Sequence, residues 1–440
     1  MPLKLLTWNI EQYGKTRALK DDSVIRNEYV AQVINKLDAD IVSLIEIKTK
    51  DFDVATKISA MLCKMLLDKY GKKYSYTFTH HNKIEIYVFL YKYEQVTPVV
   101  LSSGNRELYS LTELEKQSFV KVTDATKQFT KNTTESLSHY FPLIDYKTEQ
   151  GRPMGLGLFY DWNTQKYLAF MAWHNLAGDR WGNNKRSKKE MELLAQEDYI
   201  KAKTFTLDID KKKQKITNFI VSGDFNVNMA EDKETYQYFQ GYNITNNDNT
   251  YLHTYDPEDF YVNSIALRSA NFDNFLINCP DGYNQFTVRV EDIPKWIYDN
   301  KNVFSDLIKR ASLDDETHLT EATVTAAISV FEKQTMTEDF AIPKNQWTSI
   351  TNKLLKLKIR NDKVNPDSIS EVKKIYEDVD SKKEFDTLVK QINKQIASLA
   401  DVFSHFYNVI NNYESLTYTD TLFLTRNVLS DHLPVLLELK

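Results

Sequence analysis

The sequence is poor in cysteine, glycine and proline and contains no long apolar run. Its 2 cysteines, Cys63 and Cys279, could form at most one disulfide, which excludes a disulfide-stapled scaffold. The 11 glycines and 10 prolines fall well short of the roughly 50 expected from average usage. Because lysine, asparagine, isoleucine and tyrosine are abundant, we attribute this shortage to an AT-rich gene. No apolar run approaches the roughly 18–20 residues that span a bilayer.

The first residues, MPLKLLTWNI, lack the apolar region and small-residue cleavage site of a secretory leader. We therefore expect a soluble, cytoplasmic protein. The 42% hydrophobic and 27% charged residues are typical of a globular chain rather than a disordered one. A length of 440 residues allows two or three domains, or one large core that carries an insertion.

Apolar runs of strand length alternate with helical patterns through most of the chain. The expected strands are Leu3–Trp8, Ile41–Ile45, Ile84–Tyr91, Met154–Tyr160, Tyr167–Ala172, Ile216–Ser222, Phe272–Ile277 and Leu433–Leu439. Helical spacing marks residues 30–37 and residues 54–66, the second closed by Gly71, and a charged helix is expected over Ser187–Phe205. This interleaving predicts a layered α/β sandwich.

The segment 291–420 has few strand signals and two S-x-x-E capping boxes. Helices are expected at Lys344–Arg360, Ser368–Val379 and Ser381–Asn411. In the last of these, apolar residues alternate spacings of four and three, a repeat of about 3.5 residues. We favour an intramolecular helical hairpin, and the alternative is a coiled coil for dimerisation or partner binding. This segment holds 17 of the 56 basic and 22 of the 61 acidic residues, so it carries the whole net charge of −5.

Polar residues stand at the ends of several of these strands, where a buried polar group needs a partner. Asn9 follows the first strand, Glu46 follows Ile41–Ile45, and His174 follows a third apolar run. In Gly223-Asp224-Phe225-Asn226, Asp224 and Asn226 are two apart, which places both side chains on one face of an extended chain. Three further candidates are Asp273, Asp431 and His432. Each alone is weak, but together they predict one site.

The stretches LTWNI, IVSLIEIK, AWHN, VSGDFNVN, NFDNFLI and LSDHLPV, in this order, resemble the endonuclease/exonuclease/phosphatase superfamily, which includes DNase I and exonuclease-III-like enzymes. The resemblance implies a four-layer α/β sandwich, with two facing sheets and an active site at one edge. It extends from residue 5 to residue 435 and leaves out the helical segment. We therefore expect a catalytic core over 1–290 and 416–440 with a large, mainly α-helical insertion, 291–415, before the last strand.

The resemblance also implies roles. Glu46 would be the principal Mg²⁺ ligand, with Asn9 and Asp431 helping to hold the metal or its waters; Mn²⁺ is an alternative cation. An oxygen-rich site suits such a cation. Asp224 would orient or deprotonate the attacking water, and Asn226 would fix that water or a phosphoryl oxygen.

The two histidines complete the implied catalytic set. His432, oriented by Asp273, would stabilise the transition state, and His174 would be a general acid. In DNase I a glutamate pairs with the histidine at the His174 position. The corresponding stretch here, residues 78–82, has no carboxylate, and Glu85 is the candidate substitute.

Substrate contacts are expected from basic and polar residues near these motifs. Lys48 and Arg152 resemble phosphate-contacting positions of the superfamily, and a basic loop that contains Trp181 follows His174. The substrate-binding candidates are Lys48, Arg152, Asn175, Arg180, Lys185 and Arg186. This loop could lie along a phosphate backbone, or it could be a solvated helix start.

These features favour a divalent-metal-dependent phosphodiester hydrolase, with an endonuclease acting on DNA as the leading hypothesis. A phosphodiesterase or phosphatase acting on a lipid or small molecule is the second. The third hypothesis is a non-catalytic binding protein on a nuclease-like core. This hypothesis predicts that ligand residues are missing, and none of the expected ones is.

Overall fold

A computed structural model describes residues 2–19, 24–82, 84–102, 108–122, 140–146, 151–177, 184–244, 248–252, 268–283, 285–301, 359–360, 363–364, 417–418, 421–422, 425 and 430–440. The chain divides into two compact units. The first comprises Met1–Leu252, Ser269–Ile293 and Leu429–Lys440, and the second comprises His253–Arg268 and Pro294–Val428.

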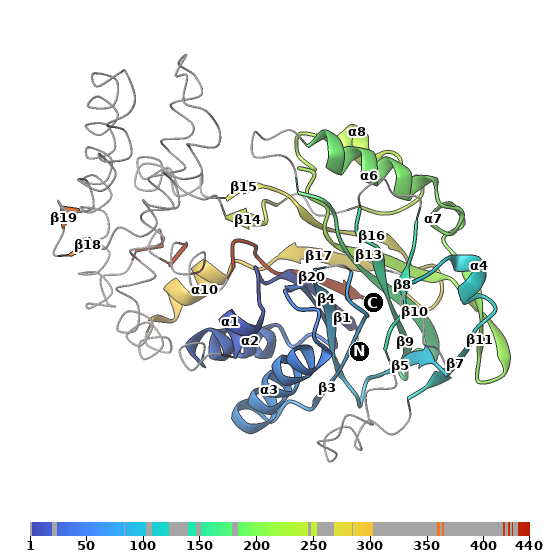
Figure 1. The fold of residues 1–440 in the computed structure, drawn as a ribbon, viewed down its shortest axis with the longest axis horizontal. Coiled ribbons are helices and arrows are strands. Elements are labelled where there is room, and N and C mark those ends of the chain that lie inside the picture. Colours follow the sequence, from blue (N-terminus) through green and yellow to red (C-terminus); the bar gives the residue numbers. More distant parts are fainter. Residues whose placement is uncertain are drawn as a thin grey trace, which may run out of the picture. The chain divides into compact units, whose positions relative to one another are not determined.

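The first unit contains a six-stranded sheet in the order β17-β20-β1-β2-β4-β3 (Figure 1). Its strands are β1 (Leu3–Asn9), β2 (Ile41–Ile47), β3 (Tyr74–Phe78), β4 (Ile86–Lys92), β17 (Phe286–Val290) and β20 (Val435–Leu439). β1 and β2 are parallel, whereas β20 runs antiparallel to β1. The C-terminal strand thus lies beside the N-terminal strand.

A second, ten-stranded sheet faces the first, and its main path is β12-β11-β7-β5-β9-β10-β13-β16. These strands are β5 (Val96–Leu101), β7 (Ser118–Lys121), β9 (Met154–Asp161), β10 (Lys166–His174), β11 (Phe205–Ile209), β12 (Lys212–Ile216), β13 (Asn218–Asp224) and β16 (Asp273–Asn278). Short strands β6 (Leu108–Tyr109) and β8 (Leu143–Ile144) join it beside β9. A separate two-stranded pair is formed by β14 (Tyr251–Leu252) and β15 (Arg268–Ala270).

Apolar side chains from both sheets meet in one buried cluster between them. Leu5, Ile45 and Phe89 come from the six-stranded sheet. Phe170 and Ile220 come from the ten-stranded sheet. Because side chains alternate along a strand, the residues between these face the helices instead. The inner faces of the two sheets therefore form the central core.

Helices cover the outer faces of both sheets (Figure 1). The helices beside the six-stranded sheet are α1 (Lys15–Ala18), α2 (Val24–Leu37) and α3 (Phe52–Tyr70), and those beside the ten-stranded sheet are α4 (Leu111–Leu114), α6 (Lys185–Gln196), α7 (Asp198–Ala202) and α8 (Lys233–Tyr236). A second buried cluster packs α6, α7 and the α8 region against the outer face of the ten-stranded sheet. The four-layer α/β sandwich expected from the sequence is therefore observed.

Two sequence-based boundaries differ from the structure. The helix expected over Ser187–Phe205 is two helices, because Glu197 has an extended ψ of 137° and Lys203 is left-handed at the end of α7. Ile359–Arg360 (β18), expected at the end of a helix, is instead a strand that pairs with Lys363–Val364 (β19).

Most of the rest of the expected helical insertion, including the apolar seam over residues 385–410, lies outside the described residues. One further helix, α10 (Ile293–Asp299), begins at the edge of this segment. Within the described part of the chain, no helix has the length and apolar character needed to cross a membrane.

Candidate active site

Three predicted site residues form a row across the ten-stranded sheet. His174 at the end of β10 lies opposite Asp224 at the end of β13, and Asp224 lies opposite Asp273 at the start of β16. All three side chains are buried. Phe170 and Ile220, each four residues earlier on its strand, are in the core between the sheets. The row therefore continues the inner face of the sheet to its edge.

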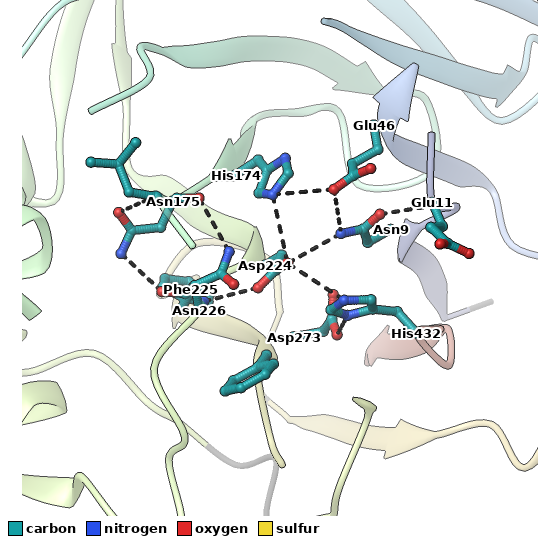
Figure 2. A network of polar contacts seen from close by, with 12 residues as sticks. Asn9, Glu11, Glu46, His174, Asn175, Asp224, Phe225, Asn226, Asp273 and His432 are labelled. Carbon is teal, nitrogen blue, oxygen red and sulfur yellow. Dashed lines mark hydrogen bonds and ion pairs between the residues drawn. The ribbon is translucent and has the colours of Figure 1, made fainter. Parts of the chain in front are cut away.

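Asn9 and Glu46 reach the same site from the six-stranded sheet. Ile45 packs into the inter-sheet core, so strict alternation would turn Glu46 toward the helices. Instead, the register of β2 against β4 shifts between Leu44 and Ile47, and Glu46 has a left-handed φ of 66°. Such a bulge re-aims a side chain, and here it directs the Glu46 carboxylate toward His174 and Asn9 (Figure 2).

Asp224 is at the centre of the polar network in Figure 2. Its Oδ2 lies 3.7 Å from Nε2 of His174 and 3.7 Å from Nε2 of His432. The same oxygen accepts a hydrogen bond from Nδ2 of Asn9 at 3.1 Å, while Oδ1 accepts the backbone N–H of Asn226 at 2.8 Å. One carboxylate is therefore placed between two imidazole rings.

His432 is held from several sides. Its Nδ1 lies 2.6 Å from Oδ2 of Asp273, and its backbone N–H donates to the Ser430 hydroxyl at 3.1 Å. Burial alone would lower the pKa of His432, but the nearby carboxylates of Asp273, Asp224 and Asp431 raise that pKa well above its usual value. The surrounding carboxylates therefore favour the protonated ring, whose Nε2 is directed at Asp224.

His174 has a carboxylate partner, Glu85. Its Nδ1 lies 2.9 Å and 3.1 Å from the two oxygens of Glu85, which is completely buried just before β4. Burial would raise the pKa of Glu85, but His174 and Arg152 outweigh it and lower that pKa to about 2. Sequence reasoning named Glu85 only as a candidate, because its distance along the chain does not show which ring it meets.

The other predicted substrate contacts are placed in several ways. Arg152 forms an ion pair with Glu85, with Nη1 3.2 Å from Oε1. Nζ of Lys48 lies 3.9 Å from Oε2 of Glu46. The amide of Asn175 donates to the carbonyls of Ser187 and Phe225, so it supports the backbone behind the site.

Lys185 and Arg186 are exposed at the start of α6, whereas Arg180 and Trp181 lie outside the described residues. Asp431 is partly buried, with Oδ1 3.9 Å from Nε2 of His432.

The donor set fits a hard divalent cation. Glu46, Asp224 and Asp431 offer carboxylate oxygens, the ligands that Mg²⁺ prefers. Oδ1 of Asn9 accepts the backbone N–H of Glu11 at 3.1 Å, so its amide nitrogen faces the carboxylates and positions them. Among the described residues, the atoms of Asp224, Asp273 and His432 also cluster within 4.8 Å.

That cluster is a poorer candidate for the metal, because a hydrogen bond already joins Nδ1 of His432 to Oδ2 of Asp273 at 2.6 Å. The oxygens around Glu46 are the better candidates.

The site brings together the buried carboxylate of Asp224, the imidazole rings of His174 and His432, and the further carboxylates of Glu46 and Asp431. The fold of the chain is similar to that of endonuclease/exonuclease/phosphatase proteins. One is a protein of that family from Bacteroides thetaiotaomicron, at 13% identity and a TM-score of 0.37, with 66% of this chain and 88% of that chain covered.

Two other similar structures carry more specific names. TDP2 of D. rerio, in complex with a single-strand DNA product, shares 12% identity at a TM-score of 0.35, over 66% of this chain and 88% of that one. A mannosyl-6-phosphatase of Bacteroides thetaiotaomicron shares 13% at a TM-score of 0.33, over 65% and 87%. No protein-family model and no curated protein sequence matches the chain.

Proposed function

We propose that this chain is a divalent-metal-dependent phosphodiester hydrolase that cuts DNA endonucleolytically. The observation that carries the proposal is the placement of Asp224 Oδ2 within 3.7 Å of both His174 Nε2 and His432 Nε2, at an edge that also holds Glu46. Hydrolysis of a phosphate ester needs an oriented water, neutralisation of charge on the phosphoryl oxygens and a proton for the leaving oxygen. Each need has a candidate residue here.

Asp224 orients the attacking water and accepts its proton. The N–H groups of Asn9 and Asn226 fix the two carboxylate oxygens, so little reorganisation is needed as the water attacks. His432 carries positive charge toward the same place and stabilises the negative charge that develops on the phosphoryl oxygens. Asp273 holds its ring in place.

His174 is the candidate general acid for the leaving oxygen. Glu85 binds its Nδ1, which leaves Nε2 directed into the site between Glu46 and Asp224. A Mg²⁺ or Mn²⁺ ion held by Glu46 and Asp431 would supply Lewis-acid stabilisation of the phosphoryl oxygens. Asn9 keeps the Glu46 and Asp224 carboxylates at a fixed spacing.

DNA is proposed as the substrate because exposed basic residues lie close to the catalytic residues in the sequence. Lys185 and Arg186 begin α6, and the Lys188 ammonium beside them pairs with Asp232. A polyanionic backbone would be attracted to such a local cluster, although the chain as a whole has a net charge of −5.

A substrate panel tests this function. Purified protein is incubated with supercoiled plasmid, abasic duplex, single-stranded DNA, RNA, sphingomyelin and phosphoinositides, with Mg²⁺, Mn²⁺ or EDTA. We expect metal-dependent nicking of plasmid, and Asp224→Asn should lower the rate by about a hundredfold to ten-thousandfold, the usual contribution of a general base.

Asp68→Asn is the matched control, because Asp68 is an exposed residue of α3 that pairs with Lys64. Intact DNA together with hydrolysis of a phospholipid or phosphoinositide would contradict the substrate. Unchanged activity in Asp224→Asn, Glu46→Gln and His432→Ala would contradict the catalytic site itself.

A further inference from the structure

Backbone N–H groups of the loop Ile10–Gly14, which follows β1, donate to both the side chain and the backbone carbonyl of Glu46. The backbone N–H of Gln12 donates to Oε2 of Glu46 at 2.8 Å, and the N–H of Tyr13 donates to the Glu46 carbonyl at 2.9 Å. The preceding N–H, that of Glu11, donates to Oδ1 of Asn9 at 3.1 Å. Two successive N–H groups of this loop therefore hold the two site residues of the six-stranded sheet.

To direct these N–H groups at Asn9 and Glu46, the loop adopts an unusual backbone conformation. Glu11 and Gln12 have φ values of 42° and 49°, both in the left-handed region that non-glycine residues rarely adopt. Such a conformation persists only where surrounding contacts fix it. The fixing contacts are therefore expected on the opposite side of the loop.

Arg26 of α2 supplies them. Its Nη2 donates to the carbonyl of Ile10 at 2.7 Å and to the carbonyl of Glu11 at 3.0 Å. Its guanidinium also lies 5.3 Å from the ring centre of the buried Tyr13. The hydroxyl of Tyr13 in turn donates to Asn27, the next residue of the same helix.

The geometry of the peptide group links these two sets of contacts. In a planar trans peptide the C=O and the N–H point in opposite directions. The Ile10 carbonyl shares its peptide plane with the Glu11 N–H, and the Glu11 carbonyl shares its plane with the Gln12 N–H. Arg26 therefore binds the carbonyl sides of the two planes whose N–H sides face Asn9 and Glu46.

We propose that Arg26 is a positioning residue for the Glu46 carboxylate, acting through the Ile10–Gly14 loop. The guanidinium fixes both peptide planes and also polarises their N–H groups toward the site. This inference rests on the proposed function in one respect: Glu46 is taken as the cation ligand. Arg26 itself contacts neither the cation nor the substrate.

The test measures Mn²⁺ binding by calorimetry without substrate, in wild type, Glu46→Gln, Arg26→Ala, Arg26→Lys and Arg289→Ala. We expect Arg26→Ala to bind about tenfold to a hundredfold more weakly, as is usual when a residue that orients a metal ligand is removed. Arg26→Lys should be intermediate. Arg289 on β17 pairs with Glu291, just after that strand, and with Glu438 on β20, so its removal should not change Mn²⁺ binding.

Amide hydrogen exchange of residues 10–14 gives a second readout that needs no metal. Arg26→Ala should speed exchange in this loop while the neighbouring strand β1 keeps its protection. Unchanged exchange and unchanged Mn²⁺ binding in Arg26→Ala would overturn the proposal. If Arg26→Ala does not fold, Arg26→Lys decides: affinity and exchange equal to wild type would overturn it.

The two proposals can fail separately. If Glu46→Gln binds Mn²⁺ as wild type does, the proposed metal site is wrong, and the exchange measurement alone decides the role of Arg26. If Glu46→Gln loses binding but Arg26→Ala does not, the metal site stands and the role of Arg26 is wrong.

Discussion

Glu85 is a completely buried carboxylate, and its ionised form is stabilised by two partners. His174 and Arg152 lower its pKa to about 2, from a usual value of 4.5. A carboxyl group with a lowered pKa stabilises the folded state above its unfolded pKa, and this stabilisation is lost as pH falls to the folded pKa. The relevant window is therefore between about pH 4.5 and about pH 2.

We predict that Glu85→Gln lowers the free energy of unfolding by on the order of 3 kcal/mol at neutral pH, because a buried partner of Arg152 is lost. The deficit relative to wild type should shrink as pH falls through that window. Urea unfolding at several pH values measures it. Glu94→Gln, which removes a half-exposed partner of Lys73, is the control and should show little deficit at any pH. A deficit in Glu85→Gln that stays constant with pH would contradict the ionised pair.

Residue types at strand ends, together with the family resemblance, predicted that these groups meet, but not how they are oriented. The sequence placed Asn9, Glu46 and Asp224 at strand ends, and all three converge. It did not show that Glu46 needs a left-handed φ to reach the site, because a bulge depends on the register of the neighbouring strand. It did not single out Arg26 either, because Arg26 acts through backbone carbonyls that any sequence possesses.

At the scale of the element, a small shift of the backbone at the end of β13 should affect the proposed reaction, because Asp224 lies there. Gly223 has a φ of +140°, and a Cβ on it would lie 1.9 Å from the carbonyl oxygen of Trp173 on β10 and 2.9 Å from Ile45. A methyl group there must push β13 away from β10. Asp224, the next residue, would move with it.

We predict that Gly223→Ala destabilises the protein by roughly 1–3 kcal/mol, typical of an overpacked core, and lowers kcat on any substrate that the protein turns over. Gly71→Ala is the control, since Gly71 is left-handed at φ +65° but has open space around it. It should cost about 1–2 kcal/mol of stability from backbone strain alone and leave kcat unchanged. Equal kcat values in the two variants would contradict the link between β13 packing and Asp224.

The elements that the sequence predicted well are those with a strong local pattern. The apolar runs of β1, β2, β9 and β10 were located within one or two residues, and Gly71 caps α3 in the left-handed conformation as expected. The charged hairpin β11–β12 was not predicted, because its outer strand β12, KKQKI, has three lysines and a single apolar residue. Its stability depends on pairing with β7 rather than on its own pattern.

At the scale of the molecule, the position of the long segment between β17 and β20 has a simple geometric basis. Val290 at the end of β17 pairs with Val435 at the start of β20, so these antiparallel strands are direct neighbours. Neighbouring antiparallel residues have Cα atoms only about 5 Å apart. A connection of a few residues could therefore join these strands, and residues between them are not needed to close the six-stranded sheet.

We predict that a variant lacking residues 295–415, joined by a short Gly/Ser linker, folds and hydrolyses a minimal phosphodiester such as bis-p-nitrophenyl phosphate at the wild-type rate. All the proposed catalytic residues lie outside the deleted stretch, and the remaining core is formally near neutral. Cleavage of plasmid DNA should change, because we propose that the removed segment governs access or partner binding. Circular dichroism confirms folding, and Asp224→Asn in the shortened chain confirms that the residual activity uses the same site. A folded variant without turnover of the minimal substrate would show that the segment supplies part of the catalytic machinery.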